Sequence, residues 1–304
     1  MVLFGPGACR VVRRPVSSGM LPALLACAAL LSACGPRPPA GKLVGTYYAT
    51  FGDALPRLRQ IDPNYNLIYL FSATPAPGQP AGTLNFAPPG DARGAWTNWV
   101  ADLQFVRTVQ KRTVLLSVGG AGHPLPFTDR AVSTRFVNSV DRLYAAWKGF
   151  DGLDFNTFEG DAAPNTTELI WIARELKRRH PGFLITAPPA PWNPVDRQFC
   201  RAMLGAGALD YCAPQYYDGP ELNDPAYLLN NIRTWVEALG AEHVLVGFGV
   251  NARLKHYWTV DSALATYGQV RARFPGVRGV FDWRLDWDVG QGSPFARRFG
   301  PLVR

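Results

Sequence analysis

The feature of this 304-residue chain that most restricts its fold is an alternation of short apolar runs with longer amphipathic stretches, which begins at residue 43. The apolar runs are rich in Val, Leu, Ile, Phe and Tyr. They show little alternation of polar and apolar residues, which is typical of strands covered on both faces. The runs are Leu43–Ala49, Asn66–Ala73, Thr113–Val118, Phe150–Phe155, Phe183–Ala187, Leu209–Tyr217, Val244–Val250 and Val277–Trp283.

Helical patterns separate these runs, and several of them begin at capping residues. Asn165 precedes one pattern and Asp224 precedes another, with Pro225 at its first helical position. Since 47% of the residues are hydrophobic, the chain has enough apolar material for a large core. The expected helices are Trp96–Lys111, Asp129–Lys148, Thr166–Arg179, Val195–Leu204, Pro225–Leu239 and Val260–Phe274.

Eight such strands alternating with helices predict an α/β protein with a single (βα)8 barrel. An open, doubly wound sheet is the alternative. That fold favours a glycine-rich phosphate-binding turn after the first strand, and Gly45–Tyr48 does not supply one. We therefore expect the barrel, and we expect chemistry at the carboxyl ends of its strands.

The N-terminal residues indicate export. Arg10, Arg13 and Arg14 precede an apolar stretch over residues 21–31, which is shorter than the roughly 20 residues needed to cross a bilayer. The stretch ends in Leu31–Gly35, which is similar to the lipobox of bacterial lipoproteins. In that motif the signal is cut before the cysteine, whose thiol then carries lipid. An ordinary signal peptide cut near the same place is the alternative.

These patterns divide the chain into a lipoprotein signal peptide over residues 1–33, a Pro-rich linker over 34–41 and a barrel over 42–304. Cys34 is the expected lipid-attachment residue. We expect a lipoprotein of the cell envelope or cell surface that is anchored to the membrane through this lipid. Cys9 and Cys27 leave with the signal and Cys34 is expected to carry lipid, which leaves Cys200 and Cys212 as a pair. These two either form a disulfide or are two small buried apolar residues.

Charge and histidine spacing exclude several classes of partner. The formal net charge is +8, and it falls to +5 when residues 1–33, with three arginines and no acid, are removed. This excess serves solubility, and no basic cluster with interleaved aromatic residues suggests nucleic acid, so none is expected as a partner. The four histidines lack the spacing of a metal site, so we expect no metal. We also expect no cofactor and a monomer.

Acidic residues gather at the end of the fourth apolar run. Asp151, Asp154 and Glu159 fall within the segment Phe150–Gly160. Carboxylates on a buried strand cannot form a solvated face, because a buried charge needs partners. The segment is therefore a candidate catalytic site.

Four segments resemble the chitinases of glycoside hydrolase family 18. Ser117–Gly120 resembles the family's S-x-G-G on the third strand, and Phe150–Gly160 resembles its D-G-x-D-x-D-x-E on the fourth. Gln215–Asp218 is similar to the Q-x-Y-N that ends the sixth strand. Gly279–Asp288 is similar to the eighth-strand segment that holds a tryptophan under the sugar. The four segments occur in the family's order along nearly the whole chain after the signal.

The resemblance implies retaining hydrolysis of β-1,4-linked N-acetylglucosamine glycans such as chitin, in which the substrate's own acetamido carbonyl is the nucleophile. The last Glu of the fourth-strand motif protonates the leaving oxygen, and the Asp two residues before it orients the acetamide. Asp154 matches the preceding acid of the motif. Tyr217 matches a tyrosine that holds the acetamide, and Trp283 matches the stacking tryptophan.

The fourth-strand motif departs from the family at its two most important positions. Asn156 stands in place of the middle Asp, and Phe158 stands in place of the Glu, with Glu159 one residue later. Because side chains alternate along a strand, Glu159 reaches the pocket only through a β-bulge. With the bulge, Glu159 is the expected proton donor, supported by Asp154 and Asn156. Without it, Phe158 fills the position of the acid and this type of cleavage fails.

Further residues are expected to bind substrate because of their places in these motifs or at strand ends. One of Tyr47 and Tyr48 should face the barrel, which the pattern does not decide; Tyr48 is included in the substrate-binding set. Asp218 is either a replacement acid or a hydrogen-bonded loop residue. The expected substrate-binding residues are Trp283, Gln215, Asp218, Tyr48, Gly119 and Gly120, with Trp192, Tyr257 and Trp258 as sugar-stacking candidates at the rim.

These observations favour a glycoside hydrolase that acts on a polysaccharide or oligosaccharide containing N-acetylglucosamine. A protein that binds such glycans but has lost the catalytic acid is the first alternative. Hydrolysis of peptidoglycan-like glycans at the same type of linkage is the second.

Overall fold

The computed structural model describes residues 41–302 apart from residues 54, 92–93, 96 and 158–163. The expectations for the signal peptide, the linker up to residue 40 and Cys34 therefore lie outside the described residues, as do Phe158 and Glu159. The barrel strands are β1 (Leu43–Ala49), β2 (Leu67–Pro75), β6 (Thr113–Gly119), β7 (Gly152–Asn156), β8 (Leu184–Ala187), β9 (Tyr211–Cys212), β10 (Gln215–Tyr216), β11 (Leu245–Gly249) and β12 (Gly279–Trp283).

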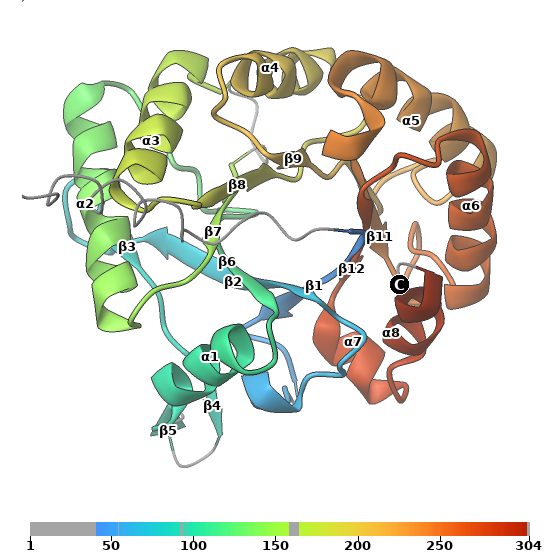
Figure 1. The fold of residues 1–304 in the computed structure, drawn as a ribbon, viewed down its shortest axis with the longest axis horizontal. Helices are drawn as coiled ribbons and strands as arrows, with labels where there is room; N and C mark the ends of the chain where they lie inside the picture. The colour runs from blue at the N-terminus through green and yellow to red at the C-terminus, as the bar shows by residue number, and fades with distance from the viewer. Residues whose placement is uncertain (1–40, 54, 92–93, 96, 158–163, 303–304) are drawn as a thin grey trace, which may run out of the picture. The chain divides into compact units, whose positions relative to one another are not determined.

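These strands form one parallel sheet in the order β10-β11-β12-β1-β2-β6-β7-β8-β9. The two ends of this order, β9 and β10, follow each other in the chain, so the sheet curls into a closed ring (Figure 1). The predicted (βα)8 barrel is confirmed.

The sixth strand differs from its prediction because Pro214 interrupts it. A proline has no backbone N–H to give to the ladder, so the run expected as Leu209–Tyr217 is split into β9 and β10. The gap is still bridged on both sides: the Ala213 N–H donates to the Ala187 carbonyl at 2.8 Å, and the Gly247 N–H donates to the Pro214 carbonyl at 3.0 Å. The ring therefore remains closed at the interruption.

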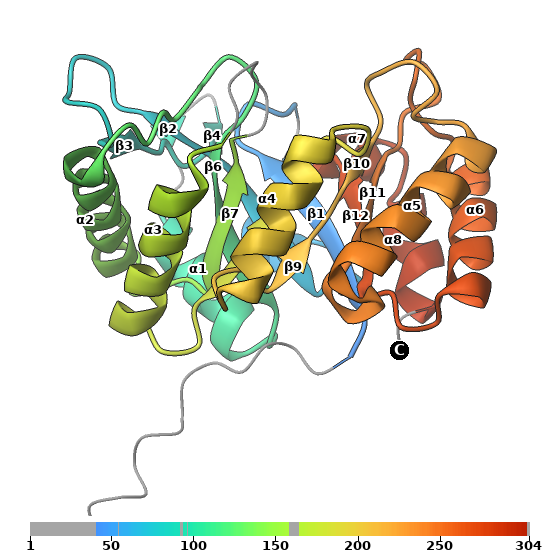
Figure 2. The ribbon, with the colours of Figure 1, turned by 90° about the horizontal axis from the view of Figure 1, so that it is seen from above.

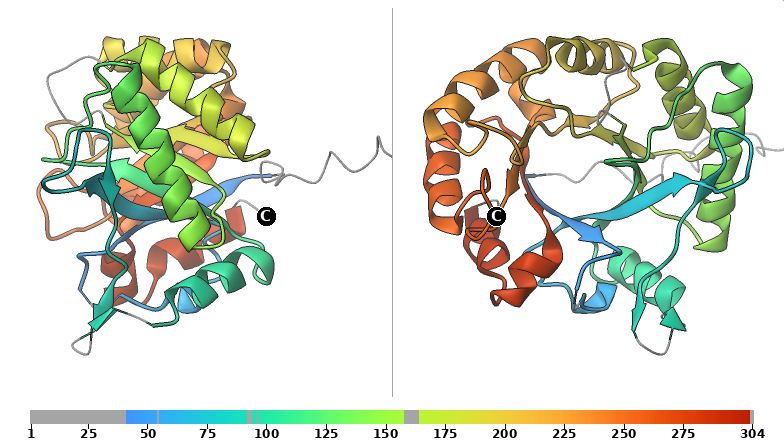
Figure 3. Two further views of the ribbon diagram at one scale, coloured as in Figure 1. Left: turned by 90° about the vertical axis from the view of Figure 1, so that its left-hand side faces the viewer. Right: turned by 180° about the vertical axis from the view of Figure 1, so that it is seen from behind.

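Helices surround the strands, and α2 to α6 follow the ring in chain order (Figure 3). Their starts agree with the capping residues in the sequence: the Asn165 side chain accepts from the Glu168 N–H at 3.3 Å, and Asp224 accepts from the Tyr227 N–H at 2.7 Å. The helices are α1 (Trp99–Thr108), α2 (Arg130–Ala146), α3 (Thr166–Arg179), α4 (Pro194–Gly205), α5 (Pro225–Leu239), α6 (Val260–Arg273), α7 (Leu285–Gly290) and α8 (Pro294–Phe299).

Smaller elements lie outside the expected pattern. The strand β3 (Leu84–Asn85) pairs antiparallel with the end of β2, and β4 (Gly90–Asp91) pairs with β5 (Gly94–Ala95). The 3-10 turns are η1 (Leu58–Gln60), η2 (Ala241–His243) and η3 (Gly300–Leu302). Across the described residues, the helices fall short of the length and apolar character that a membrane crossing requires.

Two apolar layers result from the alternation of side chains along the strands. One layer fills the inside of the barrel and includes Tyr47, Tyr69 and Phe281; the other lies between strands and helices and includes Tyr48 and Phe248. Tyr47, not Tyr48, therefore faces the interior. This choice of face decides which side chains can reach the functional end.

The cysteine pair is a disulfide in the structure. Cys200 on α4 is bonded to Cys212 on β9, and both are fully buried. Of the two possibilities that the sequence leaves open, the bridge is the one found. It ties a helix to the interrupted sixth strand.

Candidate functional site

A pocket of about 380 Å³ opens at the carboxyl ends of the strands. In Figure 2 this end is at the top, where the β2–β3 extension and the segment between β11 and α6 rise. The pocket volume falls within the usual range for small-molecule sites. It is lined by Thr50, Phe51, Phe71, Ser72, Thr74, Asn85, Ala87, Ala121, His123, Asn156, Gln215, Tyr217, Asp218 and Trp283.

Trp283 forms an aromatic wall of this pocket, and rings from β1, from β2 and from the residue after β10 hold it in place. Its ring centroid lies 5.5 Å from Tyr47 and 5.0 Å from Phe71, both edge-on, and 6.3 Å from Tyr217, nearly parallel. A large ring fixed on several sides loses little conformational entropy when a ligand stacks on it. Trp283 is thus prepared to carry the apolar face of a ring.

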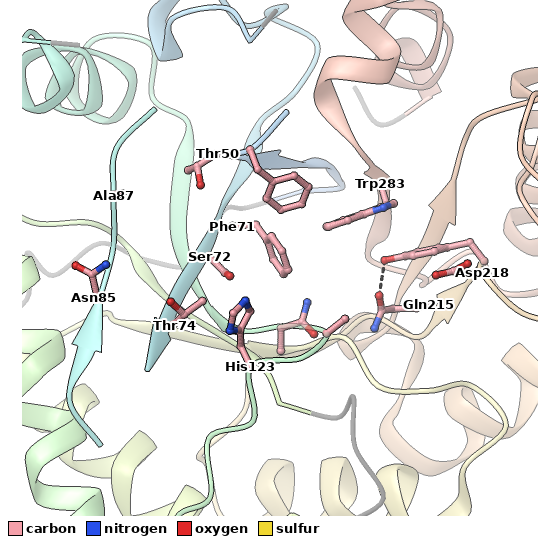
Figure 4. Close-up of a pocket in the computed structure, with 14 residues that line it drawn as sticks. Thr50, Phe71, Ser72, Thr74, Asn85, Ala87, His123, Gln215, Asp218 and Trp283 are labelled. Atoms are coloured by element: carbon pink, nitrogen blue, oxygen red, sulfur yellow. Dashed lines mark hydrogen bonds between the residues drawn. The ribbon is translucent and has the colours of Figure 1, made fainter. Parts of the chain in front are cut away.

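The sixth strand supplies the polar groups beside Trp283. The Tyr217 hydroxyl donates to Gln215 Oε1, and Gln215 Nε2 donates to the Pro188 carbonyl at 2.7 Å. Asp218 follows with a left-handed backbone, φ 62°, which Asp tolerates better than most residues, and it is exposed. Figure 4 shows Gln215 and Asp218 on the same side of the pocket as Trp283. Gln215, Tyr217, Asp218 and Trp283 are therefore brought together as the sequence predicts.

Asp154 lies beneath the pocket, inside the barrel, and it is 1% exposed. Its carboxylate accepts from the hydroxyls of Tyr47 at 2.9 Å, Ser117 at 2.8 Å and Thr186 at 2.6 Å. Burial raises the pKa of Asp154 to about 6, although the three hydroxyl donors oppose this. The same burial, together with the Asp154 charge, raises the pKa of Tyr47 well above its usual range. Asp154 thus supports the pocket floor without lining it.

Asn156 is the residue of β7 that reaches the pocket. It is two residues after Asp154 on the same face of the strand, is 2% exposed, and lines the cavity. Its Oδ1 has no hydrogen-bond partner among the described residues. A buried amide oxygen without a partner is costly, so this side chain is suited to bind a polar group of a ligand.

Gly119 and Gly120 set the position of Asn156 and do not line the pocket. The Gly120 N–H donates to the Asn156 carbonyl at 2.7 Å. A Cβ on Gly119 would lie 2.4 Å from that carbonyl oxygen, and a Cβ on Gly120 would lie 2.4 Å from the Phe71 ring. Both have positive φ, which favours glycine. Their expected contact with substrate is therefore replaced by a structural role.

Two aromatic expectations are wrong in position. Tyr48 is fully buried on the helix side of β1, and its hydroxyl donates to the Pro56 carbonyl at 2.8 Å. Trp258 is 1% exposed, and its indole N–H donates to the Tyr216 carbonyl at 2.6 Å. The reason is the side-chain alternation of β1 in the first case and core packing in the second. Trp192 is 61% exposed but does not line the pocket, whereas Tyr257 packs 5.9 Å from Tyr217.

The opposite wall of the pocket was missed by sequence reasoning. Figure 4 shows Thr74, Asn85 and His123 across from Trp283, with Phe71 between the two sides. Phe71 could have been found, since it stands at the carboxyl end of the second apolar run. Asn85 could not, because it depends on the short antiparallel pairing of Thr74 with Asn85.

Comparison with known proteins gives one sequence relative and many related folds. No family model matches the chain. The chitinase Chi52 of Paenibacillus xylanexedens is 29% identical over 171 residues, which are 51% of this chain. The matched segment spans only 31% of that protein's length.

Solved structures share the barrel at low identity. A family GH18 chitinase from Chromobacterium violaceum superposes with a TM-score of 0.73 at 19% identity, covering 88% of this chain and 84% of that one. The xylanase-α-amylase inhibitor protein XAIP-I, solved with trehalose, superposes with a TM-score of 0.66 at 17% identity, covering 86% and 98%. The chain thus has the fold of the family GH18 chitinases, a fold that an inhibitor protein shares.

Proposed function

We propose that this protein is a chitinase-like glycoside hydrolase that cleaves β-1,4-linked N-acetylglucosamine glycans with retention. The observation that carries the proposal is the pocket in which the Trp283 ring stands with Tyr217, Gln215 and the Asn156 amide oxygen, which has no hydrogen-bond partner in the described part of the chain. An aromatic face suits the C–H face of a pyranose, and the polar groups suit its acetamido substituent. The similarity to the Paenibacillus chitinase supports the same assignment.

In the proposed reaction the substrate supplies its own nucleophile. Glu159 gives its proton to the glycosidic oxygen while the acetamido carbonyl oxygen attacks the anomeric carbon, and the bond to the leaving sugar breaks. A cyclic oxazolinium ion results. Water then attacks the anomeric carbon from the vacated side and gives a proton back to Glu159, which restores the acetamide and retains the configuration. Since Glu159 lies outside the described residues, its role is carried by the motif.

The residues of the pocket hold the acetamide during these steps. The Tyr217 hydroxyl, which now donates to Gln215, can turn to the substrate, and the Asn156 amide on β7 lines the same pocket. Asp154 holds its hydroxyl partners beneath. Its burial makes it a base only above a pH of about 6.

Glycan binding without cleavage is the second candidate, and Asn156 is the observation that favours it. An amide brings no negative charge to the oxazolinium ion. Losing one such electrostatic contact lowers a rate by roughly a hundredfold to a thousandfold. The shared fold with an inhibitor protein is consistent with this candidate.

Two measurements on the same preparations separate these functions: release of fluorophore from a chitobioside and calorimetric binding of chitin oligosaccharides. We expect Glu159→Gln to abolish release and to retain binding, because it removes only the proton. The matched control Glu242→Gln, an exposed residue of η2, should behave as wild type.

Each result decides between the candidates. Release by wild type and by Glu159→Gln at equal rates removes Glu159 from the mechanism. Binding without release by the wild type assigns the second candidate. Absence of both rejects the proposed substrate class.

We further propose that the protein is exported and held at the membrane by a lipid on Cys34, as its N-terminal sequence indicates. The chain would then present the pocket to glycans of the cell envelope or of the surroundings. A monomer is proposed for this form, since one barrel holds the whole pocket.

A further inference from the structure

The amino ends of the barrel strands form the face opposite the pocket, and cations gather on part of it. In Figure 2 this face is at the bottom. Lys42 precedes β1, Lys111 lies between α1 and β6, and Lys148 lies between α2 and β7. Arg271 and Arg273 end α6, which returns the chain to β12. Since β12, β1, β2, β6 and β7 are consecutive in the sheet, these five residues follow one arc of the face, called the basic arc below.

The exposed cations of the basic arc stand without acidic partners. Lys111, Lys148 and Arg273 form no ion pair with a carboxylate in the described part of the chain. Farther along the same face the cations are paired: Lys177, near the end of α3, lies 2.8 Å from Asp210. The basic arc therefore presents positive charge to its surroundings.

Lys42 shows that charges of the basic arc are close enough to repel one another. Burial, followed by the charges of Arg271 and Arg278, lowers the pKa of its ammonium group. Its Nζ donates to the Pro275 carbonyl at 2.6 Å and to the Val277 carbonyl at 2.5 Å. The dipole of a helix attracts cations to its end. This cause does not extend to Lys42, because it precedes a strand.

Lys111 and Lys148 occupy backbone positions that suit glycine. Their φ angles are 57° and 59°, in the left-handed region that follows α1 and α2. A residue with a Cβ is less stable there than glycine. The chain thus carries an exposed lysine twice where local stability favours glycine. This indicates a use for the two ammonium groups that is separate from folding.

An anionic lipid surface is the partner that fits the basic arc. The chain enters β1 through this face, and Cys34 is eight residues before Lys42, a span of at most about 29 Å. The lipid proposed for Cys34 would therefore hold this face within reach of the membrane. Val109, close to Lys111, is 61% exposed and offers an apolar side chain to the headgroup region.

We propose that the basic arc is a docking surface for anionic lipid headgroups, which turns the Trp283 pocket away from the membrane. The proposal rests on the membrane location proposed above and is independent of the reaction. A lipid chain and a basic patch together hold a protein more firmly than either alone. By itself the arc binds reversibly, and it orients a protein that the lipid retains.

The test compares vesicles of phosphatidylcholine alone with vesicles that also contain phosphatidylglycerol. The full chain carries Cys34→Ala, so that no attached lipid contributes, and the bound fraction is measured by sedimentation. We expect this parent to prefer the anionic vesicles by roughly a hundredfold or more, because each cation near such a surface contributes about fivefold. Added salt should abolish the preference, since it screens exposed charges.

The double substitution Lys111→Gly/Lys148→Gly removes two ammonium groups from this parent. We expect the preference for anionic vesicles to fall by roughly twenty-five-fold, about fivefold for each charge. The urea midpoint should stay as in the parent or rise, because glycine suits both backbone positions. Lys111→Gln/Lys148→Gln gives the same comparison without a change of backbone preference.

The matched control is Arg253→Gln/Lys255→Gln. It removes the same charge from exposed residues of the segment between β11 and α6, at the pocket end. The preference should stay close to that of the parent, because charges at the far end of the barrel are screened from the vesicle.

Three outcomes overturn the inference. The first is equal binding of the parent to both kinds of vesicle. The second is an equal loss in the lysine variants and in the control, since net charge and not the basic arc would then set the preference. The third is binding of a DNA duplex in place of anionic vesicles, which assigns the arc to nucleic acid. Because every protein in the test lacks the Cys34 thiol, these results are separate from the fate of the lipid anchor.

Discussion

At the scale of single residues, Asn156 decides how the pocket can act. Its side chain occupies the inward position of β7 and has an oxygen without a partner among the described residues. An amide can bind the acetamide of a sugar but cannot neutralise a positive charge that develops beside it. The balance between holding a glycan and cleaving it therefore depends on this amide as well as on the proposed acid Glu159.

The substitution Asn156→Asp should raise the hydrolytic rate by roughly a hundredfold to a thousandfold, because it restores an anion next to the oxazolinium ion. The measurement is kcat on a fluorogenic chitobioside. Glu242→Gln, at an exposed position on η2, serves as a control for non-specific effects. An unchanged rate in Asn156→Asp would argue against a substrate-assisted reaction in this pocket.

Asp154 makes stability depend on pH. Its pKa is raised from 3.8 to about 6 in the fold, so the folded state binds its proton more tightly than the unfolded state. The stabilisation of the folded state that results from this tighter proton binding is fully present below pH 3.8 and is lost as pH rises through about 6. The loss amounts to about 3 kcal/mol of unfolding free energy.

Asp154→Asn should remove that dependence, because an amide carries no titrating proton. We expect the stability of the variant relative to wild type to be about 2.5 kcal/mol more favourable at pH 8 than at pH 4, measured by urea unfolding. The change in hydrogen bonding caused by the substitution affects the difference between variant and wild type equally at both pH values. It therefore cancels when the differences at pH 8 and pH 4 are compared. A difference that does not vary with pH would show that Asp154 titrates normally.

At the scale of elements, the sequence located the barrel strands well and the connections poorly. β1, α3 and α5 have their expected bounds because helix caps and strand ends depend on the types of residue at those positions. β3, α7 and α8 were not expected, since they are short and depend on contacts with distant parts of the chain. The polar wall at Asn85 therefore could not be foreseen.

The interrupted sixth strand is stabilised by the Cys200–Cys212 disulfide. Breaking a cross-link that closes a loop of this size costs about 3 kcal/mol in the chain-entropy model. We expect a reducing agent to lower the urea midpoint of the wild type accordingly. The double variant Cys200→Ala/Cys212→Ala should not respond to the reductant. A wild type that is equally indifferent would show that the two thiols are unpaired.

At the scale of the whole molecule, the carboxyl-end rule for barrels gave the place of the site. Trp283, Tyr217, Gln215, Asp218 and Asn156 do line one pocket. The error at Tyr48 arises because an apolar run does not state which face of a strand turns inward when both faces are buried. The error at Trp258, in the segment after β11, arises because the sequence does not show that this segment packs against the core. Only the packed barrel separates the two layers.

The location of the protein in the cell is tested by Cys34→Ala. Without the thiol no lipid can be attached, so the protein should move from the membrane fraction to the soluble fraction of a bacterial host. Cys27→Ala, a cysteine of the expected signal segment, is the matched control and should remain with the membrane. Retention of Cys34→Ala in membranes would contradict the lipid anchor.

The two glycines beside Asn156 have a practical consequence. Because they fix the main chain at this point from a neighbouring strand, the identity of residue 156 can change while its backbone stays in place. Variants at position 156 would form a matched series on one scaffold. Under the function proposed above, the series would extend from a reagent that binds amino-sugar oligomers without cleaving them to one that hydrolyses them.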